Sequence, residues 1–424
     1  MNLMEDLKYR GLVYQATDEP GLDRALAAGP LSLYAGFDPT ADSLGLWHLL
    51  SILLLRRFQL AGHRPIAVVG GGTGLIGDPS GKSAERSLNP RDVVEEWTRR
   101  IRSQLERFLD FSGESAARVV NNHDWLGPWK VVDFLRDTGK HFPLAQMLHK
   151  ESVTARMEAG ISFTEFSYMI LQAYDFQQLF ERHGCRLQVG GSDQWGNITA
   201  GCELIRRTQA LAGGEGAEVF GLTTPMVTRS DGKKFGKTEA GAVWLDPAKT
   251  SPYQFYQFCV NTPDEDAGRF LRYFTFLSRR EIEALEEQVR REPGKREAQA
   301  RLARELTVLA HGERAYQSAL RISQALFYGE VSELSESEME EGFRDVPSFS
   351  LQAGQSPALA DLLVMAGACP SKRQAREDVQ GGAVSVNGRK AQDPAAALSA
   401  SDRLHGKYTV LRRGKKHYTL VKWA

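Results

Sequence analysis

Between about residue 30 and residue 220, short apolar runs alternate with amphipathic stretches, which limits the chain to a few folds. Residues 31–35 and 65–69 are apolar runs of strand length, and residues 47–60 between them have the composition of a helix. A strand, a helix and a second strand at this spacing predict a parallel α/β sheet. Residues 91–110 predict a further amphipathic helix, and residues 187–189 predict a later strand that ends in a loop.

The pattern changes after this region, which indicates further domains. Residues 250–328 are helical in pattern, and residues 330–345 hold seven acidic side chains against one arginine. From residue 357 onward there are twelve basic and five acidic residues, although the whole chain has 53 of each. This asymmetry is typical of a tail domain that binds nucleic acid. We therefore expect domains over 1–246, 247–329 and 357–424, joined by a linker over 330–356.

Composition excludes several classes of protein. With 42% apolar and 25% charged residues the chain is expected to pack a core, and it contains no apolar run long enough to span a membrane. Its first residues carry acids where a signal peptide carries basic residues. The four cysteines are widely spaced, which favours neither a zinc site nor a disulfide framework. We expect a cytoplasmic, multidomain protein of the size of an enzyme.

A glycine-rich loop, GGGTGLIGDPSGKS, fills residues 70–83 directly after a predicted strand. It does not fit a P-loop, because only three residues separate Gly77 from Gly81. Its glycines do fit the dinucleotide fingerprint, but no acidic residue follows at the end of a second strand to bind a ribose. With Lys82 and Arg86 behind it, the loop suits a polyphosphate; the alternative is a chain turn with solvated basic residues.

A second loop, residues 228–238 (TRSDGKKFGKT), holds three lysines, and Phe235 is its one apolar residue. One interpretation is an exposed basic hairpin. The other is a mobile lid that brings ammonium groups to a phosphoryl transition state, where stabilisation of charge does most of the catalysis.

Residues 163–180 are apolar enough for a buried helix, yet Tyr168, Gln172 and Asp175 fall on one face of it. A buried carboxylate and amide are costly unless something satisfies them. An internal hydrogen-bond network would do so, and so would a ligand with polar ends and an apolar body. An aromatic amino acid fits the second description.

Four motifs together resemble the bacterial tyrosyl-tRNA synthetases, and the resemblance runs essentially end to end. The motifs are residues 34–42 (YAGFDPTAD), the Gly-Asp-Pro-Ser loop, residues 191–197 (GSDQWGN) and residues 234–238 (KFGKT). The resemblance implies a Rossmann-like parallel-sheet catalytic domain that binds nucleotide and tyrosine, an α-helical tRNA-binding domain and a small α+β S4-like RNA-binding domain. The S4 resemblance rests on residues 371–376 and 382–388. It also implies a homodimer that uses ATP with Mg²⁺, L-tyrosine and tRNA(Tyr), with no protein-bound metal or organic cofactor.

The resemblance assigns roles to matching residues. Tyr34 and Asp175 match the pair at the tyrosine hydroxyl, and Tyr168, Gln172 and Asp78 match residues around its amino group. The nucleotide-binding set comprises Gly36, Asp38, His48, Gly191, Asp193, Gln194 and Lys237. The set expected to act on the phosphates comprises Lys234, Lys237, Thr238, His48, Thr40, Lys82 and Arg86. Selection against phenylalanine would come from leaving Asp175 and Tyr34 without a hydrogen-bonding partner.

One segment departs from the family pattern. Where the family carries His-x-Gly-His, this chain has Gly45-Leu46-Trp47-His48, so that only the second histidine is kept. A lost phosphate donor and an indole facing the adenine are expected to weaken ATP binding and activation. Restoring both residues, as Gly45→His with Trp47→Gly, is then expected to raise ATP–pyrophosphate exchange.

Three other functions are compatible with parts of this pattern. The altered segment favours an RNA-binding or regulatory protein, derived from a synthetase, that forms no adenylate. A tryptophan-specific enzyme of the same class is opposed by Asp175 paired with Tyr34. A nucleotide-dependent oxidoreductase is opposed by the missing ribose-binding acid.

Overall fold

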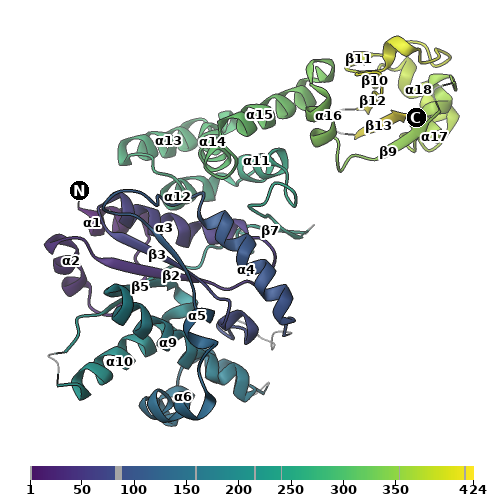
Figure 1. Cartoon of the computed structure of the whole chain (residues 1–424). Helices are drawn as coiled ribbons and strands as arrows, with labels where there is room; N and C mark the ends of the chain where they lie inside the picture. Colours follow the sequence, from purple (N-terminus) through teal and green to yellow (C-terminus); the bar gives the residue numbers. More distant parts are fainter. Residues whose placement is uncertain are drawn as a thin grey trace. The chain divides into compact units, whose positions relative to one another are not determined.

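The computed structural model describes residues 2–81, 88–157, 160–213, 216–239, 241–352, 354–414 and 417–424 (Figure 1). The chain divides into two compact units. Unit 1 comprises Met1–Thr250 and Thr262–Leu302, and unit 2 comprises Ser251–Asn261 and Ala303–Ala424. Among the described residues, no helix combines the length and apolar character that crossing a bilayer requires.

Unit 1 is built on a six-stranded sheet in the order β1-β6-β5-β2-β3-β4. Its strands are β1 (Gln15–Ala16), β2 (Ser32–Phe37), β3 (Arg64–Val69), β4 (Arg118–Asn121), β5 (Cys185–Gly191) and β6 (Phe220–Thr224). All pairs are parallel except the edge pair of β1 with β6. The strand order runs from β2 to β3 and β4 on one side and through β5 to β6 on the other. The direction in which successive strands are added to the sheet therefore reverses between β2 and β5, although the two strands are parallel. Ligands of open α/β sheets bind at such a point.

Helices flank this sheet. Figure 1 shows α3 on one side of the sheet and α9 and α10 on the other. The helices before the lysine loop are α1 (Leu3–Arg10), α2 (Glu19–Ala28), α3 (Leu49–Leu60), α4 (Arg91–Leu105), α5 (His123–Leu126), α6 (Val131–Asp137), α7 (Leu144–Leu148), α8 (Glu151–Met157), α9 (Phe163–His183) and α10 (Trp195–Leu211). The predicted strands and helices of this region are confirmed, but the helix expected over 91–110 ends at Leu105. Phe108 and Leu109 still reach the core, from the turns that follow.

The region expected to be helical is helical. It contains α11 (Pro252–Val260), α12 (Asp264–Phe274), α13 (Arg279–Arg291), α14 (Glu297–His311) and α15 (Glu313–Tyr328). Leu302, Leu306, Ala319 and Ile322 are buried, as their spacing predicts. α12 and α13 belong to unit 1, whereas α11 and α15 belong to unit 2.

Unit 2 ends in a mixed five-stranded sheet in the order β11-β10-β12-β13-β9. Its strands are β9 (Ser348–Leu351), β10 (Val384–Val386), β11 (Arg389–Lys390), β12 (Tyr408–Arg413) and β13 (His417–Trp423), and its short helices are α17 (Leu359–Met365) and α18 (Lys372–Gln380). These elements confirm the predicted fold class, in which a small domain with a mixed sheet follows the α/β and helical parts.

The segment predicted as a linker, residues 330–356, contains regular structure. It holds the short turn η6 (Val331–Glu333), the helix α16 (Glu336–Gly342) and strand β9. Met339 of α16 is fully buried, in a cluster with Val410 and Leu420 of the C-terminal sheet. Strand β9 pairs in parallel with β13. Much of this acidic segment therefore belongs to the packed fold of unit 2.

Candidate active site

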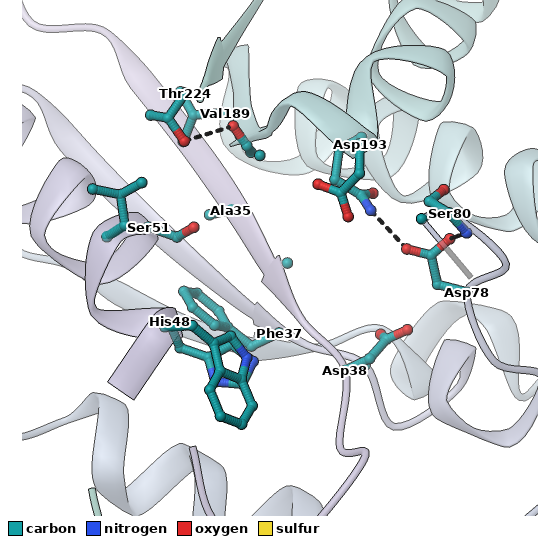
Figure 2. Close-up of a pocket in the computed structure, with 18 of the residues that line it drawn as sticks. Ala35, Phe37, Asp38, His48, Ser51, Asp78, Ser80, Val189, Asp193 and Thr224 are labelled. Atoms are coloured by element: carbon teal, nitrogen blue, oxygen red, sulfur yellow. Dashed lines mark hydrogen bonds between the residues drawn. The ribbon is translucent and has the colours of Figure 1, made fainter. Parts of the chain in front are cut away.

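A cavity of about 330 Å³ lies at the point where the strand order of unit 1 reverses. Figure 2 shows Phe37 and Asp38 at the end of β2, His48 and Ser51 at the start of α3, and Asp78 across the cavity. The parallel strands bring their carboxyl ends to one edge of the sheet. Residues that are far apart in the sequence therefore meet there.

One end of the cavity is closed by two buried groups, Asp175 and Tyr34, which both line it. Asp175 accepts a 2.7 Å hydrogen bond from the indole Nε1 of Trp125 on one oxygen and a 2.9 Å bond from Nδ2 of Asn122 on the other. The Tyr34 hydroxyl is buried and has no hydrogen-bonding partner among the described residues. Such an unsatisfied group is costly, so it is expected to find its partner in a ligand.

Burial shifts the pKa values of both groups upward, with different consequences. Burial raises the pKa of Asp175 to about 7, although the hydrogen bonds from Asn122 and Trp125 oppose the shift. Burial, together with the charge of Asp175, raises the pKa of Tyr34 well above its ordinary value. The Tyr34 hydroxyl therefore stays protonated, and Asp175 titrates near neutral pH while the cavity is empty.

The middle of the cavity is held by a hydrogen-bonded chain that begins at Asp38. Its Oδ2 accepts a 2.6 Å bond from the hydroxyl of Tyr168, and its Oδ1 accepts a 2.6 Å bond from Oγ1 of Thr73. Asn122 donates to Thr73 as well as to Asp175, at 2.8 Å and 2.9 Å. Two carboxylates are thus connected through neutral donors, and this fixes their orientation.

A second network orients the amides beside this chain. Gln194 donates to Oδ2 of Asp78 at 2.7 Å and accepts a 3.2 Å bond from Gln172. Asn197 donates to the side-chain oxygen of Gln172 at 3.1 Å, and the backbone N–H of Ser80 donates to Asp78 at 2.9 Å. Asp78 is thereby held facing the cavity, where it adds negative charge beside Asp38 (Figure 2).

Asp193 lies at the same polar wall, directly after β5 (Figure 2). Burial and the neighbouring charge of Asp78 raise the pKa of Asp193, while Gln194 and Lys234 act in the opposite direction. A cation or a sugar hydroxyl at this wall would relieve the repulsion between the carboxylates. Among the described residues, no group of three or more histidine, cysteine, aspartate or glutamate side chains could hold a metal ion.

His48 stands at the opposite wall as a neutral donor. Its Nδ1 accepts a 2.9 Å hydrogen bond from the backbone N–H of Gly45, and burial lowers its pKa to about 4. An imidazole whose Nδ1 accepts must carry its proton on Nε2. His48 can therefore offer one N–H to a ligand, without a charge, at any pH well above 4.

The lysine loop, defined as residues 228–238, borders the cavity through Lys234 and Lys237. Between them, Phe235 is buried. The centroid of its ring lies 4.4 Å from that of Phe270 and 4.9 Å from that of Phe274. The loop is a bridged hairpin in which residues 228 and 234 pair, and it continues into the short antiparallel pair β7 (Lys237–Thr238) and β8 (Gly241–Ala242). One apolar anchor thus holds a loop whose ammonium groups remain exposed.

Most of the predicted site residues meet in this one cavity. Those that line it are Tyr34, Gly36, Asp38, Thr40, His48, Asp78, Tyr168, Gln172, Asp175, Gly191, Asp193, Gln194, Lys234 and Lys237. Thr238 does not; it is exposed and donates a 3.0 Å bond to the backbone of Gly241. Lys82 and Arg86 lie outside the described residues.

Sequence reasoning missed several residues that organise the site. Asn122 and Trp125 hold Asp175, and Thr73 holds Asp38. Asn197 lies in the motif of residues 191–197, but the resemblance assigns it no role, and in the structure it holds Gln172. The available signal was a polar stretch, Asn121-Asn122-His-Asp, at the carboxyl end of strand β4, because parallel strands present such residues at one edge of the sheet.

Comparison with known proteins adds to this geometry. The model of the class I tRNA synthetases (W and Y) matches residues 26–328, and that of the tyrosine–tRNA ligase SYY-like C-terminal domain matches residues 338–421. The chain is 60% identical to the tyrosine–tRNA ligase of Geobacillus stearothermophilus over 425 residues, which cover 100% of both chains. It is 58% identical to tyrosine–tRNA ligase 1 of Bacillus subtilis, over 99% of both. A C-terminally truncated mitochondrial tyrosyl-tRNA synthetase from Aspergillus nidulans has a TM-score of 0.69 and 31% identity, over 77% of this chain and 94% of that chain.

Proposed function

The chain belongs to the tyrosine–tRNA ligases of the class I synthetase family, and we propose that the cavity of unit 1 is where it activates tyrosine. The enzyme joins L-tyrosine to tRNA(Tyr) in two steps that consume ATP. An oxygen of the tyrosine carboxylate attacks the α-phosphorus of ATP, the bond to pyrophosphate breaks, and tyrosyl-adenylate forms. A hydroxyl of the terminal nucleotide at the 3′ end of the tRNA then attacks the tyrosyl carbonyl, and AMP leaves.

The alternatives left by the sequence are not favoured. Relatives of 57–60% identity that match over essentially the full length are tyrosine–tRNA ligases, which disfavours both a regulatory protein without adenylate formation and a tryptophan-specific enzyme.

The observation that carries the site assignment is the buried pair at the closed end of the cavity. A phenol placed there donates its proton to Asp175 and accepts a hydrogen bond from the Tyr34 hydroxyl. The Tyr34 hydroxyl then gains the partner that it lacks, and Asp175 gains a third hydrogen bond beside those from Trp125 and Asn122. Phenylalanine would displace water from the same volume and satisfy neither group. The closed end therefore selects tyrosine.

The amino group of the substrate belongs beside Asp78, Tyr168 and Gln172. Asp78 and Asp38 place two carboxylates on this wall, which favours an ammonium ion. Because the Tyr168 hydroxyl already donates to Asp38, its oxygen is free to accept from the ammonium group. This arrangement leaves the substrate carboxylate pointing toward the open end of the cavity.

ATP enters at the open end with its Mg²⁺ as part of the substrate. His48 donates to the nucleotide, Gly36 allows close approach because it has no side chain, and Asp193 and Gln194 bind the ribose. Gly191 and Asp38 complete this set. The pyrophosphate is held by Lys234 and Lys237, with Thr40, Lys82, Arg86 and Thr238 assigned to the same task. No side chain forms a covalent bond, because positioning and stabilisation of charge suffice for phosphoryl chemistry.

Transfer requires tRNA, and we assign contacts with it to unit 2. The region from residue 357 onward has twelve basic and five acidic residues. At the end of α15, Phe327 and Tyr328 are 75% and 69% exposed, and such rings stack on unpaired bases. Affinity that comes from phosphate contacts falls steeply as salt is raised. We place the reaction in the cytoplasm, where ATP and tRNA are available.

One assay tests the proposal. Tyrosine-dependent exchange of labelled pyrophosphate into ATP reports the first step, and charging of tRNA(Tyr) reports the second. We expect both with tyrosine and neither with tryptophan. Tyrosine binding without exchange, at any ATP concentration, would contradict the proposal.

The affinity for tyrosine is expected to depend on pH through Asp175. The phenol donates to the ionised carboxylate, and the pKa of Asp175 in the empty cavity is about 7. Tyrosine should therefore bind with constant affinity well above pH 7 and about tenfold more weakly for each pH unit well below it. Calorimetric titration with tyrosine alone measures this dependence.

Loss of folding does not account for such weakening. Because burial raises the folded-state pKa above the unfolded-state value, this carboxyl contributes more stability as pH falls from 7 toward 4. Tyrosine affinity that stays constant from pH 8 to pH 5 would rule out an ionised Asp175 as the acceptor.

The exposed apolar side chains of unit 1 support a homodimer. Seven of them fall between residues 131 and 163: Val131, Val132, Leu135, Leu144, Leu148, Met157 and Phe163. Monomers rarely expose so many large apolar groups within one stretch of chain.

A charge in this stretch is expected to prevent assembly. Phe163→Asp should halve the mass measured by sedimentation, since a buried carboxylate at an interface is costly. Leu211→Asp is the matched control, because Leu211 at the end of α10 is also 75% exposed but lies outside the stretch. Equal masses for both variants would place the dimer interface elsewhere.

A further inference from the structure

The indole of Trp47 lies in a slot between two glycines. A Cβ at Gly45 would fall 2.2 Å from the Cη2 atom of Trp47, and a Cβ at Gly236 would fall 3.2 Å from its Cε3 atom. The indole also lies near two other rings, with centroid distances of 5.1 Å to His48 and 5.9 Å to Trp244. Trp47 thus joins the start of α3 to the lysine loop.

The backbone around the slot makes the same connection. Leu46 N–H donates to the carbonyl of Val243 at 2.8 Å, and Val243 N–H donates to the carbonyl of Gly236 at 2.8 Å. Residues 45 and 244 form an antiparallel bridge. The segment before α3 is therefore hydrogen-bonded to the strand that supports the lysine loop, and the indole packs across this junction.

The glycine at position 45 is required by space. Its φ of −87° and ψ of 163° are open to any residue, so that backbone conformation does not demand glycine here. The three atoms nearest to a Cβ at Gly45 all belong to the indole of Trp47. Gly45 and Trp47 therefore form a matched pair, in which one residue supplies the volume that the other fills.

We propose that Trp47 is a positioning residue that holds the lysine loop in place, so that Lys234 and Lys237 reach the phosphates of ATP. The two lysines flank Gly236, the residue in the loop against which the indole packs. The proposal rests on the function proposed above. It differs from the expectation based on sequence, in which the indole only obstructs the adenine.

Trp47→Ala separates the two ideas because they predict opposite changes. Loss of the packing should lower the rate of ATP–pyrophosphate exchange about tenfold while leaving the affinity for tyrosine unchanged. It should also speed tryptic cleavage after Lys233, Lys234 and Lys237, identified from fragment masses. Trp47→Phe, which keeps a ring in the slot, should restore most of both properties. A faster exchange in Trp47→Ala would show that the indole is an obstruction, and would overturn the proposal.

Two controls keep the test decisive. Trp129→Phe changes a tryptophan that packs on Tyr174 and does not line the cavity, and it should alter neither readout. Gly45→Ala should speed cleavage of the loop when Trp47 is present and have little effect in the Trp47→Ala background. Tryptic cleavage does not depend on turnover. Unchanged cleavage would therefore overturn this proposal even if exchange were normal, whereas absent exchange in the unmodified protein would count against the proposed function instead.

Discussion

Replacing Asp175 with asparagine is expected to lower kcat/KM for tyrosine activation at least about a hundredfold and to leave activation of phenylalanine nearly unchanged. The carboxylate accepts hydrogen bonds from Trp125 and Asn122 and would accept a third from the substrate. An amide has one acceptor oxygen, so that its NH₂ group must face one of these donors. Pyrophosphate exchange measured with both amino acids gives the change in their ratio.

Two further variants show whether the effect belongs to the closed end of the cavity. Asp92→Asn, at the exposed start of α4, makes the same chemical change outside the cavity and should have no effect. Tyr34→Phe removes the hydroxyl without a partner and should lower the preference for tyrosine by a smaller factor. If Asp175→Asn kept the preference for tyrosine, the hydroxyl of the substrate would have to bind elsewhere.

Replacing Lys234 or Lys237 with alanine is expected to slow formation of tyrosyl-adenylate by a factor on the order of 10² to 10³. Each ammonium group borders the cavity and would meet charge that develops on the departing pyrophosphate. The affinity for tyrosine should stay the same, because the proposed task of both lysines is to hold the phosphates of ATP and not the phenol. Rapid-quench measurement of a single turnover separates the chemical step from substrate binding.

The loop supplies its own control for this experiment. Lys233 is exposed, does not line the cavity and lies 3.8 Å from a carboxylate oxygen of Glu239. Lys233→Ala removes the same charge from the neighbouring position and should change the rate less than threefold. If all three variants lost the same factor in rate, the net charge of the loop would matter, and the particular positions of Lys234 and Lys237 would not.

Site residues that lie close together in the sequence could be predicted, because helical spacing shows which of them share a face. Tyr168, Gln172 and Asp175 share one face of a single helix, and the structure brings all three to one cavity. The partners of Asp175 could not be found in this way. Asn122 directly follows β4 and Trp125 lies in α5, about fifty residues earlier, and only the parallel order of the sheet brings them within hydrogen-bonding distance.

The acidic segment shows a different limit of sequence reasoning. Its composition is that of a linker, yet Glu338 is buried, where it accepts bonds from Ser335 and from Arg321 of α15. Met339 beside it fills part of the core. An acid that composition counts toward disorder can thus be held by a serine cap and by an arginine distant in sequence, and composition does not record such pairing.

The slot that holds Trp47 also restricts the order in which residues 45 and 47 can be substituted. A histidine introduced at position 45 alone meets the indole at far less than contact distance, so that this variant is expected to be damaged before any new donor can help. Removing the indole first opens the room that a side chain at 45 needs. The two positions are therefore epistatic, and the mutational path toward a His-x-Gly-His segment runs through position 47 before position 45.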